Sequence, residues 1–168
     1  MSRVNTDRVD AVVEAWSREL PGVVGVELAL GKRAHRVSAL LAAEVDAELA
    51  RFGLTKAEYD VLAVLRSAGP PYRLRPSDLS QRLLLSSGGT SNLLRRLTTE
   101  GLVERDPHPD DARGNWVRLS GKGVAVAEDA VKAASAAQAA LLRDVPPETV
   151  GAAIDALRNL LIALGDGR

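Results

Sequence analysis

The sequence predicts a mainly helical protein built around a winged helix-turn-helix, which is a pair of helices joined by a short turn and followed by a small β-hairpin, the wing. A short helical segment at 76–83 is followed, after a brief turn, by a second helical segment at 86–97. A pattern of alternating side chains typical of a hairpin then occupies 103–119. Helical patterns flank this unit on both sides, so the sequence predicts further helices at the N- and C-terminal ends.

The composition fits a globular core of aliphatic side chains, because 46% of the 168 residues are apolar and 3% are aromatic. The absence of cysteine excludes disulfides and thiolate metal sites, and with two histidines we expect no metal site. The net charge is zero, but the stretch from Arg73 to Lys122 has nine basic and six acidic residues. With no apolar stretch of about 20 residues and no signal peptide, we expect a cytoplasmic protein that does not contact a membrane.

Two helices are predicted before residue 53. The first, at about 6–19, has its apolar side chains on one face, and Pro21 and Gly22 end it. The second runs from about 23 to 52, with apolar residues at steps of three and four. Its length is more than twice the mean of about 11–12 residues, and such a helix in a small protein usually packs against a second chain or domain.

The segment at 54–120 has clear helix boundaries. Thr55 and Glu58 have the spacing of a capping box, in which each side chain hydrogen-bonds the backbone of the other. Gly101 lies just after the second helix of the pair, where a left-handed residue ends a helix, and Leu102 follows it as in a Schellman motif. The alternation predicts strands at 103–105 and 116–119, with a loop at 106–115 because this segment holds two prolines and Gly114.

Ser120 is positioned to cap a helix that extends to about 141, and Pro146 and Pro147 separate it from a last helix that ends near Leu164. The chain is therefore divided into N-terminal helices at 1–53, a winged helix-turn-helix lobe at 54–120 and C-terminal helices at 121–168.

The second helix of the pair carries short polar side chains in its N-terminal half, where a helix-turn-helix meets base edges. These residues are Ser87, Thr90, Ser91 and Asn92. An Asn can bind adenine through two hydrogen bonds, and Ser or Thr can bind any base or phosphate. Arg95 and Arg96 are expected to bind phosphates, with an internal salt bridge to a carboxylate as the alternative for Arg96. The alternative for the polar group as a whole is simple capping of an exposed helix.

The predicted wing places Arg113 at its tip, next to Gly114 and Asn115. A flexible arginine there can enter the minor groove of DNA or bind a phosphate. The alternative is that Asp111 and Arg113 brace the hairpin. Trp116 is expected to pack within the hairpin rather than to stack on a base.

This order of elements resembles the MarR family of bacterial transcription regulators over nearly the whole chain. The segments that carry the resemblance are 54–62, 87–97, 101–105 and 109–113, followed by Leu119 and Ser120. The resemblance implies an intertwined homodimer held by the terminal helices, a palindromic operator in double-stranded DNA, and release by a small-molecule effector.

The first helix, with Trp16, and the run at 68–76 resemble the branch of this family that responds to urate or tricarboxylic acids. In its urate-responsive members a Trp, an Asp and two Arg form the ligand set, and Trp16, Asp60 and Arg105 match three of these positions. The fourth, directly after Asn92, is Leu93 instead of Arg. His35 is a further candidate as a pH-sensitive contact, or else a helix-surface residue. The alternative to a ligand site is that Trp16 packs in the core of an interface and that Asp60 and Arg105 form a structural ion pair.

We therefore expect a ligand-responsive, DNA-binding regulator that acts as a homodimer on a palindromic operator, is released by a small anionic or aromatic ligand, and serves as a repressor. The alternative is a winged-helix protein-interaction module without sequence-specific DNA binding, which the zero net charge would fit. We expect no enzyme and no cofactor, because no nucleophile–base spacing or phosphate-binding glycine loop is present.

Overall fold

The computed structural model describes residues 6–84, 86–108 and 111–166, without the side chains of 87 and 106–115. The elements are α1 (Arg8–Glu19), α2 (Val26–Arg51), α3 (Lys56–Ser67), β1 (Arg73–Leu74), α4 (Pro76–Leu83), α5 (Ser87–Thr99), β2 (Val103–His108), β3 (Asp111–Leu119), α6 (Gly121–Leu141) and α7 (Pro147–Ala163). The chain is mainly helical with one small antiparallel sheet, which confirms the predicted fold class.

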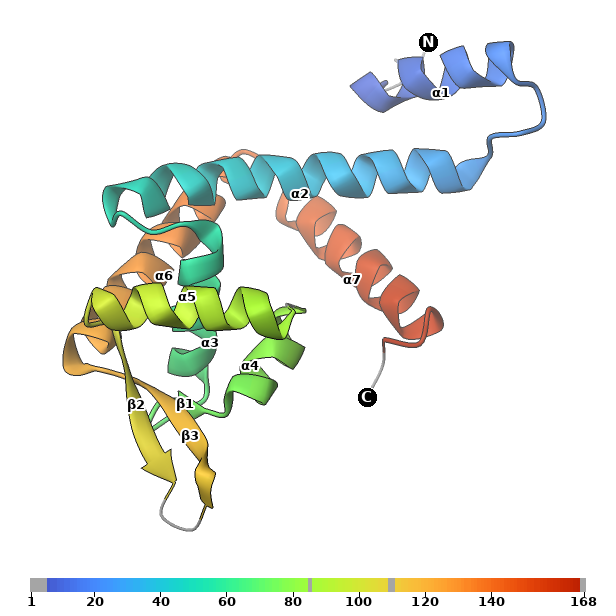
Figure 1. The fold of residues 1–168 in the computed structure, drawn as a ribbon. Helices are drawn as coiled ribbons and strands as arrows, with labels where there is room; N and C mark the ends of the chain where they lie inside the picture. Colours follow the sequence, from blue (N-terminus) through green and yellow to red (C-terminus); the bar gives the residue numbers. More distant parts are fainter. Residues whose placement is uncertain (1–5, 85, 109–110, 167–168) are drawn as a thin grey trace.

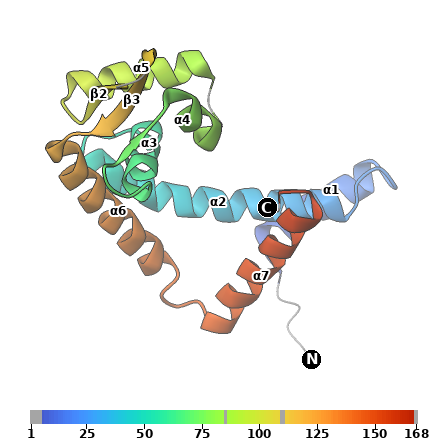
Figure 2. The same cartoon turned by 90° about the horizontal axis from the view of Figure 1, so that it is seen from below.

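A compact lobe lies at one end of a long helical arm (Figure 1). The arm is α2, whose 26 residues span about 39 Å. Helices α3, α4 and α5 and the sheet form the lobe at the C-terminal end of α2, while α1 lies along the opposite half of α2. Helix α6 packs on both α2 and α3, and α7 then turns away from it, so that α2, α6 and α7 form a triangle (Figure 2).

The sheet has the strand order β1-β3-β2, and both neighbouring pairs are antiparallel. The predicted loop at 106–115 was wrong in its extent, because β2 continues to His108 and β3 begins at Asp111. Backbone pairing to a partner strand holds Pro107 opposite Asn115, and a single-strand pattern cannot reveal such pairing. The two-residue β1 was not predicted, although it joins the other edge of β3.

The core lies where α3 meets α5, α6 and the sheet. The completely buried side chains of α3 are Val61, Leu62 and Leu65. They pack with apolar residues of the neighbouring elements, namely Leu79, Leu94, Leu97, Leu102, Val103, Val117, Leu119, Ala127, Ala130 and Ala134. Alanines on α6 allow this helix to approach α3 closely, because they add little side-chain volume between the two backbones.

Local motifs fix the ends of the helices that carry the candidate site. The Thr55 and Glu58 capping box is confirmed, since each side chain bonds the backbone of the other. The Schellman motif after α5 is also confirmed: Gly101 has φ +71°, and the N–H of Leu102 donates to the carbonyl of Leu97 at 2.9 Å. These motifs set where α3 begins and where the chain leaves α5 for β2.

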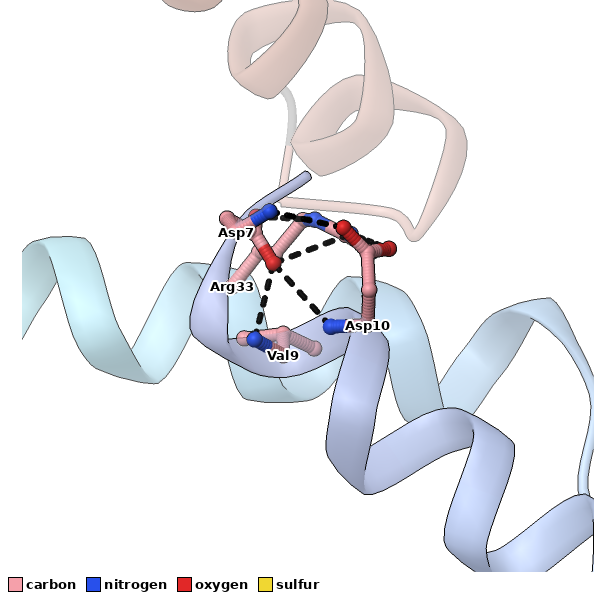
Figure 3. A network of polar contacts seen from close by, with 4 residues as sticks. All are labelled: Asp7, Val9, Asp10 and Arg33. Carbon is pink, nitrogen blue, oxygen red and sulfur yellow. Dashed lines mark hydrogen bonds and ion pairs between the residues drawn. The ribbon is translucent and has the colours of Figure 1, made fainter. Parts of the chain in front are cut away.

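Helix α1 is attached to α2 by a polar cluster around Arg33 (Figure 3). The guanidinium of Arg33 donates to Asp7 Oδ2 at 2.8 Å and to Asp10 Oδ1 at 2.6 Å. Asp7 also caps α1, because its Oδ1 accepts from the N–H groups of Val9 and Asp10. The hydrogen bond from Arg33 is the main cause that lowers the pKa of the Asp7 carboxyl below its ordinary value.

Within the described residues, no helix combines the length and the apolar character that crossing a bilayer requires.

Candidate nucleic-acid interface

The two helices of the motif are α4 and α5. Helix α4 ends at Leu83, and the next residue, Leu84, has a left-handed φ of +52°. Ser86 caps α5 by accepting from the N–H of Gly89 at 3.2 Å. The hydroxyl of Thr90, one turn into α5, hydrogen-bonds Ser80 of α4 at 2.8 Å and the carbonyl of Ser86 at 3.1 Å. This tie fixes the position of α5 against α4.

The role of Thr90 corrects a sequence prediction. Thr90 was expected to contact DNA, but the residue is only 2% exposed. Its hydroxyl is directed to Ser80 and Ser86 within the lobe, so it positions α5 instead of facing a ligand. The sequence signal was ambiguous, because a polar residue near a helix N-terminus fits both roles.

The exposed side of α5 carries Ser91, Asn92 and Arg95. Arg95 donates to Asn92 Oδ1 at 2.9 Å, so the two side chains lie together on one turn. The first turn of α5 has no acidic residue, which leaves the positive end of the helix dipole unopposed by a local carboxylate. Ser87 is the first residue of α5, and its side chain lies outside the described part of the structure. This surface offers amide, hydroxyl and guanidinium groups in a form suited to a nucleic acid.

Arg96 lies on another side of α5 and makes the alternative contact considered from the sequence. Its Nε lies 2.7 Å from Glu58 Oε1 and 3.7 Å from Glu100 Oε1. Glu58 is 2% exposed, so Arg96 neutralises a buried carboxylate at the start of α3. The structure therefore shows the internal salt bridge that was the alternative for Arg96, while its side chain stays 54% exposed and the expected phosphate contact stays a prediction.

Arg113 and Asn115 belong to β3, in the outer part of the wing. Asn115 pairs with Pro107 across the hairpin. The side chains of both residues lie outside the part of the chain that is described, so their contacts to DNA stay predictions.

A polar hollow of about 320 Å³ lies between α5 and β2. It is lined by Ser91, Asn92, Arg95, Thr98, Thr99 and Arg105. Two arginines and several hydroxyl groups around a small volume are suited to an anion. Sequence reasoning missed Thr98 and Thr99, although their spacing from Arg95 along the helix could have indicated a shared face.

The expected ligand residues, Trp16, Asp60 and Arg105, and the further candidate His35 do not form one site within a single chain. Asp60 pairs with Lys56, with 2.6 Å between Nζ and Oδ2, and Arg105 lines the hollow beside α5. Trp16 is half exposed on α1, which lies along the far half of α2 from the lobe, and His35 lines a shallow depression on α2 (Figure 1). No group of three or more metal-ligating side chains occurs among the described residues.

Comparisons with known proteins decide the family. The model of the MarR family matches residues 52–114, which contain α3, α4, α5 and most of the wing. The HTH-type transcriptional regulator PecS of Dickeya dadantii is 30% identical over 118 residues, which are 70% of this chain and 71% of PecS. The multiple antibiotic resistance protein MarR of Escherichia coli is 32% identical over 99 residues, which are 59% of this chain and 67% of MarR. The chain belongs to the MarR family.

A solved structure of a MarR variant from Escherichia coli in complex with operator DNA has the same fold, with a TM-score of 0.70 and 25% identity. The similarity covers 87% of this chain and 97% of that one. As a member of the MarR family, this chain is a DNA-binding transcription regulator. The named relatives are regulators and not enzymes, in agreement with the sequence analysis.

Proposed function

We propose that this MarR-family chain acts as a homodimer on a palindromic operator, represses transcription there, and is released by a small anionic or aromatic ligand. The observation that carries the proposal is the exposed face of α5, where Asn92 and Arg95 lie together on a helix held by Thr90. A recognition helix must be rigid and exposed at once, because orientation against base edges is what gives sequence specificity.

The helical arm supports the homodimer. Helix α7 buries none of its residues, and Ile154, Leu157 and Leu161 are about half exposed. A groove of about 580 Å³ between α2 and α7 is lined mainly by apolar side chains, including Leu30, Val37 and Leu41. A second copy that covered these surfaces would remove them from water, which is the main driving force of association. We place the dimer interface on the exposed apolar faces of the helices within 1–53 and 121–168, and the DNA-binding lobe at 54–120.

In such a dimer the two copies of α5 would enter successive major grooves, about 34 Å apart along the duplex. Two identical lobes related by a two-fold axis require an operator whose half-sites are inverted repeats. The wings would then lie over the flanking minor grooves, with Arg113 at each tip. Occupying the operator in this way blocks access to the same DNA, which is the basis of the proposed repression.

The polar hollow beside α5 supports release by an anion. Arg95 and Arg105 line it together with Asn92, so a ligand bound there would occupy side chains that are proposed to contact DNA. Because binding of the ligand and binding of DNA would exclude each other, the ligand would lower the apparent affinity for the operator. The presence of α1 supports placing the chain in the branch with an extra N-terminal helix, where Trp16 would contribute to the ligand response.

Operator binding is tested with a palindrome selected from a random-sequence duplex library, at matched salt concentration. Asn92→Ala and Arg113→Ala should each weaken binding about 5- to 100-fold, the range for losing one base or groove contact. Arg143→Gln, in the exposed turn between α6 and α7, is the matched control and should bind as the parent does. If both lobe variants bind the palindrome as tightly as the parent, the assigned interface is wrong.

The homodimer is tested by sedimentation equilibrium of the parent and of Leu157→Asp. The parent should sediment as a dimer, and the variant should shift toward monomer because it places a charge in an apolar interface. Asp155→Ala, on an exposed α7 side chain paired with Arg158, is the control and should remain dimeric. A monomeric parent that still binds a palindrome with one-site stoichiometry would contradict the proposal.

The effector is tested by thermal shift with urate, citrate, trans-aconitate and phenolic compounds. A ligand that raises the unfolding temperature should also displace the operator, and Arg105→Gln should remove both effects. Loss of both effects in Trp16→Ala would support the branch assignment. If the parent protein binds no DNA duplex but does bind another protein, the alternative function as a protein-interaction module would be favoured.

A further inference from the structure

At the base of the wing, two arginines lie close to the indole ring of Trp116. The guanidinium carbon of Arg73 is 4.9 Å from the ring centre, and that of Arg75 is 5.4 Å from it. Both distances are within the range of cation–π attraction, which restrains a long side chain without neutralising its charge. Arg73 belongs to β1, and Arg75 is the residue directly before α4.

The sheet register explains how the three side chains meet. Arg73 pairs with Arg118 and Leu74 with Val117, so the next residue along, Arg75, comes level with Trp116. Leu74 and Val117 are buried, and alternation along the strands therefore directs their neighbours to the other face of the sheet.

The location of Arg75 relates it to both DNA-reading elements. Helix α4 contacts α5 on one side and β3 on the other, and its first turn lies next to the wing (Figure 1). In a helix-turn-helix the first helix crosses the DNA backbone while the second enters the major groove. In the proposed complex, the start of α4 would therefore lie near the phosphate strand that runs between the recognition helix and the wing.

The charges around Arg75 differ from those around its neighbours. Arg118 is paired with Glu104 at 2.8 Å, and Arg73 has an interaction besides its contact with the Trp116 ring. Arg75 is exposed, and no carboxylate forms an ion pair with it among the side chains that the structure describes. Asp78, in the first turn of α4, accepts a hydrogen bond from Ser77 instead. Arg75 is thus a charged group that is already oriented but not neutralised.

We propose that Arg75, oriented by the ring of Trp116, binds a phosphate of the DNA backbone and adds a contact between the recognition helix and the wing. The inference rests on the proposed operator binding. Stacking on Trp116 removes much of the rotamer freedom of Arg75 before DNA arrives, so less entropy is lost when the phosphate binds. Trp116 is in this view a positioning residue and does not itself contact a base.

The salt dependence of binding tests the contact, because each phosphate neutralised by a cation changes the slope of log K against log salt by about 0.9. The probes are the selected palindrome and a random-sequence 30-base-pair duplex. In a homodimer that carries Arg75→Gln in both copies, the slope of log K against log salt should become less steep by about 1.8 on both duplexes. The affinity should be about 60-fold weaker at 0.1 M salt. Arg143→Gln removes the same charge outside the lobe, in the exposed turn that follows α6, and should leave the slope unchanged.

Two variants of Trp116 separate positioning from direct contact. Trp116→Phe keeps an aromatic face and should retain most of the affinity, while Trp116→Leu should lower affinity with a slope close to that of the parent, because Arg75 keeps its charge.

An unchanged slope and affinity in Arg75→Gln would overturn the inference, even if Trp116→Leu fails to fold. If the parent binds neither duplex, the proposed operator binding fails. If the parent binds the palindrome and Asn92→Ala weakens that binding, an unchanged Arg75→Gln variant contradicts the role of Arg75 and leaves the proposed operator binding intact.

Discussion

Arg96 of the recognition helix and Glu58 of α3 form a direct salt bridge, with 2.7 Å between Nε and Oε1. The other carboxylate oxygen of Glu58 accepts from the backbone N–H and the hydroxyl of Thr55, at 2.8 and 2.7 Å. One buried carboxylate therefore caps α3 and holds α5 at the same time. The start of α3 follows directly on the arm helix α2, so this contact joins the arm to the recognition helix.

Replacing Arg96 by Ala should lower stability much more than it lowers the intrinsic affinity for DNA. The variant leaves the buried carboxylate of Glu58 without its cation, at a cost of about 2 kcal/mol. Thermal unfolding and operator binding of the same sample measure the two effects.

Arg95→Ala is the matched control for that experiment, because Arg95 is exposed on the same helix and bonds Asn92 only locally. It should leave the unfolding temperature almost unchanged and weaken operator binding. An equal loss of stability in the two variants would contradict the assigned role of Arg96.

Thr90→Val should destabilise the lobe by about 1–2 kcal/mol, because valine fills the same volume but loses the hydrogen bonds to Ser80 and Ser86. The free energy of unfolding in urea measures this change. Ser91→Ala, one residue later and exposed, should weaken DNA binding with little effect on stability. A valine variant as stable as the parent would show that Thr90 is not an anchor.

Gly123→Ala should destabilise the protein by about 1–3 kcal/mol, since a Cβ at this position would clash with the carbonyl oxygen of Leu102. That oxygen is backbone, so either α6 or the start of β2 must move. Gly121→Ala, two residues earlier, is the control because a Cβ there meets nothing within 4 Å. It should be neutral or slightly stabilising through higher helix propensity. Similar unfolding temperatures for the two variants would contradict this packing.

The attachment of α1 should depend on pH through Asp7. Its pKa in the folded protein is lowered, mainly by the hydrogen bond from Arg33, so its contribution to stability is complete above the ordinary value of 3.8. This contribution is lost as the pH falls through the lowered pKa. Fluorescence of Trp16, in a Trp116→Phe background, should report release of α1 in that acidic range.

Arg33→Gln removes the group that lowers the pKa of Asp7. In this variant α1 should already be loosened at neutral pH, and the acid transition of Trp16 fluorescence should be smaller. An identical transition in parent and variant would mean that another group controls α1.

Local sequence signals predicted the helices and their ends well, because caps and stops depend on a few neighbouring residues. Thr55 with Glu58, Pro76 and Gly101 all act where the sequence places them. The extent of the hairpin was underestimated, since strand residues near Pro107 are held by cross-strand pairing that local preference does not contain.

The candidate site was predicted less completely than the fold. Asn92 and Arg95 are exposed on α5 as expected, but Thr90 is buried and Arg96, although half exposed, pairs with Glu58. Periodicity shows which residues share a face of a helix. Whether a polar side chain of α5 meets solvent or a polar partner depends on where α3 and α4 lie. The stacking of Arg75 on Trp116 could not be predicted for the same reason, because it depends on the pairing of β1 with β3.

The pairing of β1 with only the last part of β3 has a mechanical consequence for the wing. At Val117 and Arg118, β3 has a partner on both edges, whereas from Trp116 outward it is accompanied by β2 alone. A strand held on both sides resists bending more than a two-stranded ribbon does. In the proposed complex, the outer hairpin would therefore be able to tilt about a point near Trp116 and follow minor grooves of different width, while the recognition helix keeps its orientation.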